Sequence, residues 1–232
     1  MNYDGITRES LFLMADNRFR NSKAFYDEHK EEMKAGITVP LRQIAAEVVP
    51  DLLKLDEKMV SNPVKMVSRF RRDTRFTRDQ SLYRDHMWIM FMRDKHAFTG
   101  YPAFWFEVTP GNYSMGMGMF MTSPAQMNLY RRYLREKTAE FRKAAAKCEK
   151  NGSLIYGSEY KRMPAECPPG LEPYYGRKEF GFIRYSDNVD DLAGEGIIDI
   201  VKKTYKDYAP MFKYLFEVAE EFNTAGEGEE KQ

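Results

Sequence analysis

The sequence predicts a single α+β domain, with a mainly antiparallel sheet of about five to six strands packed against helices. Three observations predict this class. Apolar residues in the first third recur every three to four positions, short alternating segments fill the middle third, and helical spacing returns near the C-terminus. Helices, then a run of strands, then helices is typical of an α+β fold rather than of alternating βαβ units. The 232 residues, 43% of them hydrophobic, suffice for one buried core.

The first third predicts a set of amphipathic helices. Thr7 has the side chain of an N-cap, and a first helix is expected after it. Residues 22–34 place their apolar side chains on one helical face, and Gly36 is expected to end that helix. A further helix is predicted over residues 39–55, kinked or split at Pro50.

The middle of the chain predicts strands joined by short turns. Residues 114–121 alternate strictly, with four methionines on one face and Gly116, Gly118 and Phe120 on the other. This methionine run predicts core packing, and its glycines predict a close-packed or bulged strand. The predicted strands are residues 66–71, 86–93, 104–109, 114–121, 153–156 and 179–185.

One long central helix and two C-terminal helices complete the prediction. Ser123 caps the central helix, Gln126 completes a capping box, and Asn151 with Gly152 ends the helix. The C-terminal helices are expected over residues 190–205 and 208–221. The domain is therefore predicted to span residues 1–222, with a disordered acidic tail over residues 223–232.

Composition excludes several classes of protein. The 36 basic and 35 acidic residues leave a net charge of only +1, which excludes a bulk basic nucleic-acid coat protein. No apolar run approaches the roughly 18–20 residues of a membrane span, and no secretory signal is visible. Cys148 and Cys167 make no disulfide framework, so we expect a cytoplasmic location.

Positive charge is concentrated in residues 65–84, here called the arginine-rich segment. It holds seven basic residues against two acidic ones, and six of the seven are arginine. Guanidinium groups match phosphate or carboxylate with paired hydrogen bonds, so this density favours an anion site. Arg131 on the central helix joins this site if that helix lies beside the segment. The predicted anion-binding residues are Arg69, Arg72, Arg75, Arg78, Arg84 and Arg131.

The two acidic residues of the segment are candidate catalytic carboxylates. Asp73 has a functional interpretation as a general base or a metal ligand, and Asp79 is the second candidate. The arginines adjacent to Asp73 would lower its pKa and weaken it as a base. The alternative for Asp73 is structural, because it can orient the arginines by ion pairing or cap a turn, and this interpretation is favoured.

Other chemical signatures are absent from the sequence. It contains no P-loop, dinucleotide fingerprint, nucleophile elbow or zinc-ligand spacing, so neither a cofactor nor a metal is assigned. His86, just after the arginine-rich segment, is the histidine most worth testing. Aromatic residues near the cations, among them Trp88, fit either a packed core or a stacking surface for nucleobases.

The segment also carries a family resemblance. Residues 69–79, followed by Tyr83-Arg84, resemble the signature of a conserved hypothetical family of bacteria and fungi, domain of unknown function 2461. Residues 21–30, 160–164 and 174–180 are similar to further elements of that family in the same order. The resemblance covers roughly residues 5–220 and implies no reaction.

Three hypotheses of function follow. The first is a protein that binds a small phosphorylated or carboxylated ligand at the arginine-rich segment, either as a binding protein or as an enzyme. The second is a structural or interaction protein in which the arginines form an internal network with carboxylates. The third, less favoured, is nucleic-acid or polyphosphate binding, which would depend steeply on salt.

Overall fold

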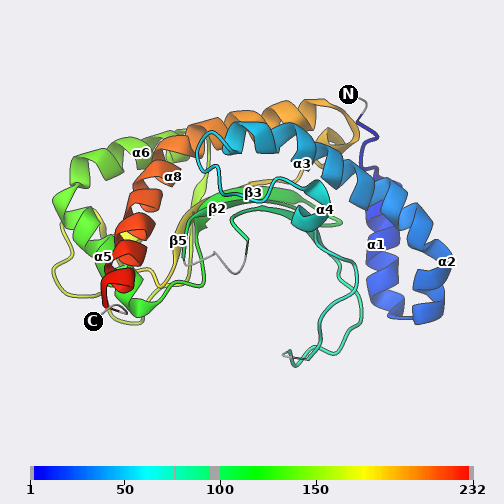
Figure 1. Cartoon of the computed structure of the whole chain (residues 1–232). Helices are drawn as coiled ribbons and strands as arrows, with labels where there is room; N and C mark the ends of the chain where they lie inside the picture. The colour runs from blue at the N-terminus through cyan, green and yellow to red at the C-terminus, as the bar shows by residue number, and fades with distance from the viewer. Residues whose placement is uncertain (1–2, 76, 95–99, 230–232) are drawn as a thin grey trace.

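A five-stranded antiparallel sheet, covered on one face by helices, forms the centre of the molecule (Figure 1). The computed structural model describes residues 3–75, 77–94 and 100–229. Its strands are β1 (Met87–Phe91), β2 (Ala103–Val108), β3 (Tyr113–Met119), β4 (Leu154–Tyr156) and β5 (Phe180–Ser186). Its helices are α1 (Arg8–Arg20), α2 (Lys23–Met33), α3 (Val39–Leu52), α4 (Pro63–Met66), α5 (Pro124–Glu136), α6 (Thr138–Lys150), α7 (Glu172–Tyr175) and α8 (Gly196–Glu229). The single α+β domain predicted from the sequence is thus confirmed.

The strands lie in the order β1-β2-β3-β5-β4, and every neighbouring pair is antiparallel. Alternate side chains of these strands point into one core beneath the helices, as the period of two requires. Phe104 of β2, for example, stacks on Phe212 of α8 with ring centroids 4.9 Å apart. The buried side chains of this covered face include Met87, Ile89, Phe91, Phe104, Phe106, Val108, Met115, Met117, Met119, Phe180 and Phe182.

The methionine alternation of β3 ends one residue pair earlier than predicted. Met115, Met117 and Met119 are buried, but Met121 is 84% exposed and has a positive φ of 57°. The chain leaves the sheet there because it must turn toward the N-cap of α5.

The predicted strand over residues 66–71 is an irregular edge ribbon. Val67 forms a bridge with Ile89, and Arg71 forms one with Tyr83. Between the two bridges, one side of the ribbon has two more residues than the other. The extra residues bulge out, and the regular ladder is interrupted. The ribbon carries the arginine-rich segment away from the edge of β1 (Figure 1).

The N-terminal helices begin where predicted, but Gly36 does not end one. Thr7 caps α1 and Ser22 caps α2 through their side chains. Residues 34–38 then form a π-helical turn, η1 (Lys34–Thr38), which leads directly into α3. A Cβ at Gly36 would lie 2.2 Å from the Ser10 side chain, so glycine is needed there for close packing against α1.

The predicted central helix is two helices. The break lies at Lys137, whose φ of −118° and ψ of 39° are not helical. The ammonium of Lys137 pairs with Glu217 of α8 at 2.8 Å, and the Thr138 hydroxyl donates to the Leu134 carbonyl at 2.6 Å. Packing of both halves on α8 therefore overrides the local helical preference.

The Gln126 side chain also departs from the predicted capping box. Ser123 accepts a hydrogen bond from the Gln126 amide N–H, as expected of an N-cap. The Gln126 side chain is buried, and its Nε2 donates to the Gly100 carbonyl at 2.7 Å, whereas a capping box would have this side chain accept from the Ser123 backbone N–H. The second half of the box is therefore replaced by a tertiary contact.

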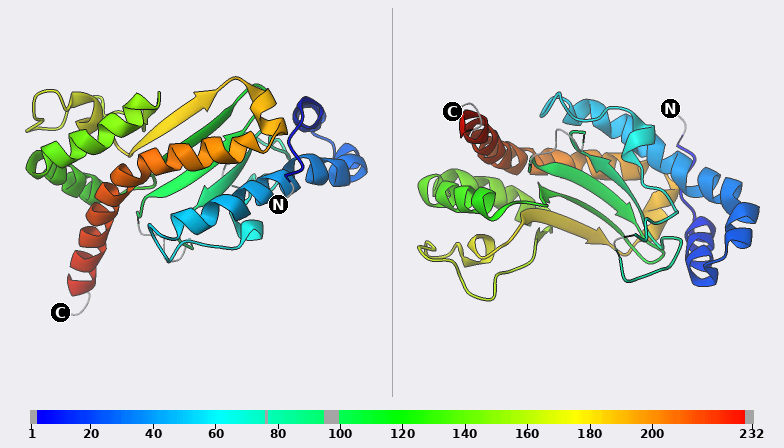
Figure 2. Two further views of the ribbon diagram at one scale, coloured as in Figure 1. Left: turned by 90° about the horizontal axis from the view of Figure 1, so that it is seen from above. Right: turned by 60° about the horizontal axis from the view of Figure 1, so that its bottom comes forward.

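One helix, α8, replaces the two predicted C-terminal helices. A 3-10 turn, η2 (Val189–Ala193), precedes it, and Pro210 lies inside it. Figure 2 shows that α8 changes direction along its length, which accommodates a residue that lacks a backbone donor. The first part covers the sheet, and the later part packs against α5 and α6.

The helix α8 also replaces part of the predicted tail. It continues to Glu229, so residues 223–229 are helical where a disordered acidic tail was predicted. The Asn223 amide donates to the Ala219 carbonyl and the Thr224 hydroxyl to the Glu220 carbonyl, both at 2.7 Å. Extending an existing helix costs far less than nucleating one, which explains the continuation. Residues 230–232 of the predicted tail lie outside the described residues.

In the described part of the chain, no helix has both the length and the apolar character to cross a membrane.

Candidate functional site

The face of the sheet opposite the helices, here called the open face, carries no second layer among the residues that the structure describes (Figure 2, right). At one end of it, α1, α2 and the arginine-rich segment extend below the plane of the strands (Figure 1). At the other end lies the loop of residues 157–179, beside α5. The open face is therefore bordered at two ends, which is the arrangement of a binding groove.

Two rows of side chains cross the open face. In the first row, Trp88 of β1 lies opposite Glu107 of β2, Glu107 opposite Ser114 of β3, and Ser114 opposite Tyr185 of β5. In the second row, Met90 is followed by Trp105, Gly116 and Ile183. Residues directly opposite on neighbouring strands have adjacent side chains, so each row forms one continuous surface.

Glycines lie beside the large side chains of this surface. An added Cβ at Gly116 would lie only 2.1 Å from the Trp105 ring, so the indole lies directly over that glycine. Beyond it, Gly118 of β3 pairs with Gly181 of β5 and places no side chain on the open face. The open face carries a hollow of about 450 Å³, here called the sheet groove. It is lined by His86, Trp88, Met90, Trp105, Glu107, Ser114, Phe120, Tyr156, Ile183 and Tyr185.

A carboxyl group faces the sheet groove in an aromatic setting. Burial raises the pKa of Glu107, and the negative charge of Asp85 raises it further, while His86 acts in the opposite direction. His86 bonds through Nδ1 to Asp85 Oδ1 at 2.8 Å and stacks on Trp88 with ring centroids 5.4 Å apart. Asp85, His86 and Glu107 thus form a compact set of titratable groups at one end of the groove.

Arg84 is the cation next to these groups. Its guanidinium carbon lies 4.4 Å from the centroid of the Trp88 ring, and its Nε donates to the Arg69 carbonyl at 3.1 Å. Burial lowers the pKa of Arg84, and the like charge of Arg72 lowers it further. Among the described residues Arg84 forms no ion pair. A half-buried cation that is repelled by a second cation is a favourable place for an anion.

Arg72, by contrast, belongs to an internal network. Asp79 accepts hydrogen bonds from Arg72 and, at 2.8 Å, from Arg18 of α1. Asp79 also accepts from the amide and hydroxyl of Ser81, at 2.9 and 2.7 Å. These hydrogen bonds hold the pKa of Asp79 far below its ordinary value of 3.8. The network fastens the arginine-rich segment to α1.

Asp73 forms a second, local pair. It accepts from the Arg75 guanidinium at 2.7 and 2.9 Å, and these bonds lower the pKa of Asp73 to about 2. A carboxylate so firmly ionised and paired is a weak base. The catalytic role predicted for Asp73 and Asp79 therefore stays a prediction that their hydrogen bonds do not favour.

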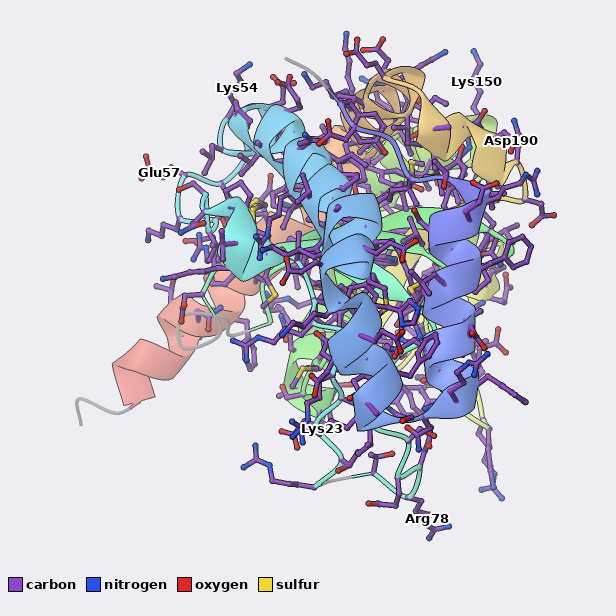
Figure 3. All side chains as sticks on the ribbon, turned by 90° about the vertical axis from the view of Figure 1, so that its right-hand side faces the viewer. Lys23, Lys54, Glu57, Arg78, Lys150 and Asp190 are labelled. Atoms are coloured by element: carbon purple, nitrogen blue, oxygen red, sulfur yellow. The ribbon has the colours of Figure 1, made fainter. Side chains whose placement is uncertain are left out.

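The other predicted cations occupy different places. Arg69 and Arg78 are exposed and have no ion pair among the described residues. Arg78 lies at the far tip of the segment and points away from the body of the molecule (Figure 3). Of the predicted arginines, Arg69 and Arg84 are thus the ones that directly contact each other near the groove.

Arg131 does not join this group, contrary to the sequence prediction. It lies on α5, at the end of the sheet away from the arginine-rich segment (Figure 1), and is only 5% exposed. Its guanidinium donates to the carbonyls of Tyr175 and Arg177, at 3.1 and 2.9 Å. Arg131 therefore holds the loop of residues 157–179 against α5.

Sequence reasoning missed several groove residues, namely Trp105, Glu107, Ser114, Tyr156 and Tyr185. The signal was present, because the outward positions of the predicted strands carry large aromatic and acidic side chains beside glycines. This pattern did not predict a groove, because only the tertiary structure shows which sheet face lacks a covering helix among the described residues. Among the described residues, no three side chains of His, Cys, Asp or Glu gather as metal ligands would.

The fold and the groove define a single-domain α+β protein with a candidate ligand site on an uncovered sheet face. The model of the family described as conserved hypothetical protein, domain of unknown function 2461, matches residues 10–214. The chain belongs to this family, as the resemblance of residues 69–79 indicated. No curated protein matches the chain.

Proposed function

We propose that the protein binds a small anionic ligand, phosphorylated or carboxylated, at the end of the sheet groove where Arg84 lies. The observation that carries the proposal is the setting of Arg84. This cation is partly withdrawn from water, repelled by Arg72, and without a counter-ion among the described residues. Arg69, whose backbone carbonyl accepts from Arg84, is the second candidate cation, and it is exposed.

A thermal-shift titration tests the proposal. Inorganic phosphate, pyrophosphate and simple dicarboxylates are added to the wild-type protein, to Arg84→Ala and to Arg8→Ala. Arg8 is the matched control because it is exposed and paired with Asp190. A ligand at about 100 times its Kd adds about 2.7 kcal/mol to stability. For a domain of this size that shift in Tm is roughly 5–10 °C.

The expected result is a shift in the wild type and in Arg8→Ala that Arg84→Ala loses. An equal shift in all three proteins would place the anion elsewhere, and no shift with any anion would overturn the proposal. The proposal includes a cytoplasmic location, which the content of two cysteines favours.

The internal network is a second candidate role for part of the segment. Its support is Asp79, which accepts from two arginines of different elements. We propose that Arg72, Arg75 and the two aspartates shape and anchor the segment, while Arg84 and Arg69 meet the ligand.

A further inference from the structure

We propose that the sheet groove holds the base of a nucleoside phosphate, stacked on its aromatic side chains, with the phosphate at Arg84. This inference rests on the proposed anion site and adds the chemistry of the rest of the ligand. The groove as a base site follows from three features of its lining: aromatic faces, a hydrogen-bonding floor, and a size set by the bordering walls.

Aromatic rings dominate the groove. Six of its ten lining residues carry one, counting the imidazole of His86. The Trp105 ring lies over Gly116, and Tyr156 supports it with ring centroids 5.1 Å apart and an interplanar angle of 58°. A ring fixed from below and from the side is a preorganised platform for a flat ligand. Every nucleobase has a face that stacks on such a platform.

The floor of the groove supplies polar partners for the edge of a base. Glu107 and Ser114 lie opposite each other on β2 and β3, between Trp88 and Tyr185. A carboxyl group that keeps its proton presents a donor and an acceptor side by side. Nucleobase edges carry the complementary pattern. Burial and the nearby Asp85 both favour the protonated form of Glu107, and His86 is the facing group that opposes it.

The dimensions favour a free nucleotide over a longer strand. The hollow of about 450 Å³ lies within the roughly 300–1,000 Å³ typical of small-molecule sites. The arginine-rich segment with α1 and α2 borders one end, and residues 157–179 border the other (Figure 1). Single-strand binding proteins instead offer a long positive groove, whereas Glu107 lines this one and Asp85 lies close enough to act on its pKa.

The chain provides its own reporter for the test. It contains two tryptophans, Trp88 and Trp105, and both line the groove. Intrinsic tryptophan fluorescence therefore reports on the groove alone. The probes are adenosine monophosphate, adenosine, ribose 5-phosphate and an adenylate oligonucleotide, each titrated by fluorescence and by calorimetry.

The expected results distinguish the contribution of the base to binding from that of the phosphate. Adenosine monophosphate should quench the tryptophans and bind about tenfold more tightly than ribose 5-phosphate, because stacking adds to the anion contact. Adenosine should quench with a weaker affinity. If ribose 5-phosphate binds as tightly as the nucleotide, the base site is overturned and the anion site stands. If adenosine binds as tightly as the nucleotide, the anion site fails instead.

Two other outcomes would also decide against the inference. No binding of any probe overturns the base site and the anion site together. Much tighter binding of the oligonucleotide than of the nucleotide, with a steep salt dependence, overturns the free ligand and favours single-strand binding.

Variants assign the contacts. Glu107→Leu removes the donor and acceptor and should weaken nucleotide binding about tenfold, without affecting ribose 5-phosphate. Glu107→Gln keeps a donor beside an acceptor and should bind like the wild type at acidic pH, where Glu107 holds its proton. Tyr156→Leu removes the lateral support of Trp105 and should weaken binding without loss of a hydrogen bond. Phe19→Ala, an exposed aromatic of α1, is the control.

Each variant is first checked for a cooperative melt. Should Glu107→Leu fail to fold, the comparison of Glu107→Gln with the wild type across pH still tests the role of the carboxyl. Wild-type affinity should fall as rising pH ionises Glu107, and the Gln variant should not follow. Parallel pH profiles, or full affinity in Tyr156→Leu, would overturn the assigned contacts.

Discussion

The Trp105 indole covers Gly116 so closely that a methyl group on that glycine would lie 2.1 Å from the ring. The contact joins two neighbouring strands on the open face and shapes the sheet groove. Both residues are paired in register, so neither can move aside without disturbing the ladder. Replacing the glycine therefore offers a direct way to alter the groove from its floor.

We expect Gly116→Ala to displace Trp105 and to cost about 1–3 kcal/mol of unfolding free energy, as overpacking of a tight contact does. The displaced indole should also show red-shifted fluorescence because it gains water. Urea melts with fluorescence detection measure both effects. Gly111→Ala is the matched control, since nothing lies within 4 Å of an added Cβ there. Equal stability of the two variants would show that Trp105 does not rest on Gly116.

The pairing of Arg84 with Trp88 predicts charge-selective quenching. A cation 4.4 Å from the indole attracts iodide and repels caesium, so iodide should quench wild-type fluorescence more strongly. Arg84→Met should lower quenching by iodide and leave quenching by neutral acrylamide nearly unchanged. Trp105→Phe, which leaves Trp88 as the one tryptophan, sharpens the measurement. Equal iodide quenching with and without Arg84 would contradict this geometry.

Asp79 should decide whether the arginine-rich segment stays docked on α1. We expect Asp79→Asn to speed trypsin cleavage within the segment, because Arg18 and Arg72 lose their shared acceptor. Asp73→Asn, whose carboxylate pairs with Arg75 inside the same loop, should change cleavage far less. Since the pKa of Asp79 is lowered in the folded state, its contribution is present above pH 3.8 and is lost as pH falls further. Cleavage of both variants at the wild-type rate would argue against the docking role.

Breaking the buried ion pair of Arg93 with Asp56 should lower the free energy of unfolding more than breaking the exposed ion pairs of the arginine-rich segment. The two side chains are 6% and 2% exposed and lie 2.7 Å apart, and Tyr101 stacks on the guanidinium at 3.5 Å. We expect Arg93→Met to cost about 3–5 kcal/mol, because the Asp56 carboxylate is left buried without its cationic partner and retains only the Lys58 backbone N–H. The double variant Arg93→Met with Asp56→Leu should recover much of that loss. Chemical denaturation of the single and double variants measures the coupling, and additive losses would contradict it.

The raised pKa of Glu107 predicts a pH dependence of stability. The folded state holds this proton more tightly than the unfolded chain, whose ordinary value is 4.5. The stabilising contribution is therefore full below pH 4.5 and is lost as pH rises through the folded pKa. Glu107→Gln should remove this loss, so its Tm relative to wild type should rise across that window. Asp85 and His86 are present in both proteins, so the difference between the two curves reports on Glu107. A constant difference would contradict the raised pKa.

Local patterns predicted most of the elements correctly. The predicted caps Thr7 and Ser123 depend on residues three positions away, so the sequence contains the whole interaction. The alternation of residues 114–119 likewise needs only the period of a strand. Where the prediction was wrong, a contact with a residue far away in the sequence determined the local structure. Gly36 serves the packing of Ser10, and Lys137 pairs with Glu217, which is 80 residues away in the chain.

The sequence by itself determined the α+β class, the membership of the family and the concentration of arginines in residues 65–84. The class follows from short-range periodicity, the family from the motifs of residues 69–79 and their flanks, and the concentration of arginines from composition. None of the three depends on contacts between distant residues. Only the tertiary structure decided which arginines are paired and which stay open. Asp79 meets Arg18 from 61 residues away, Arg131 is drawn to loop carbonyls, and Arg84 is brought over Trp88. Charge and stacking act through space, so the chain had to fold before these partners met.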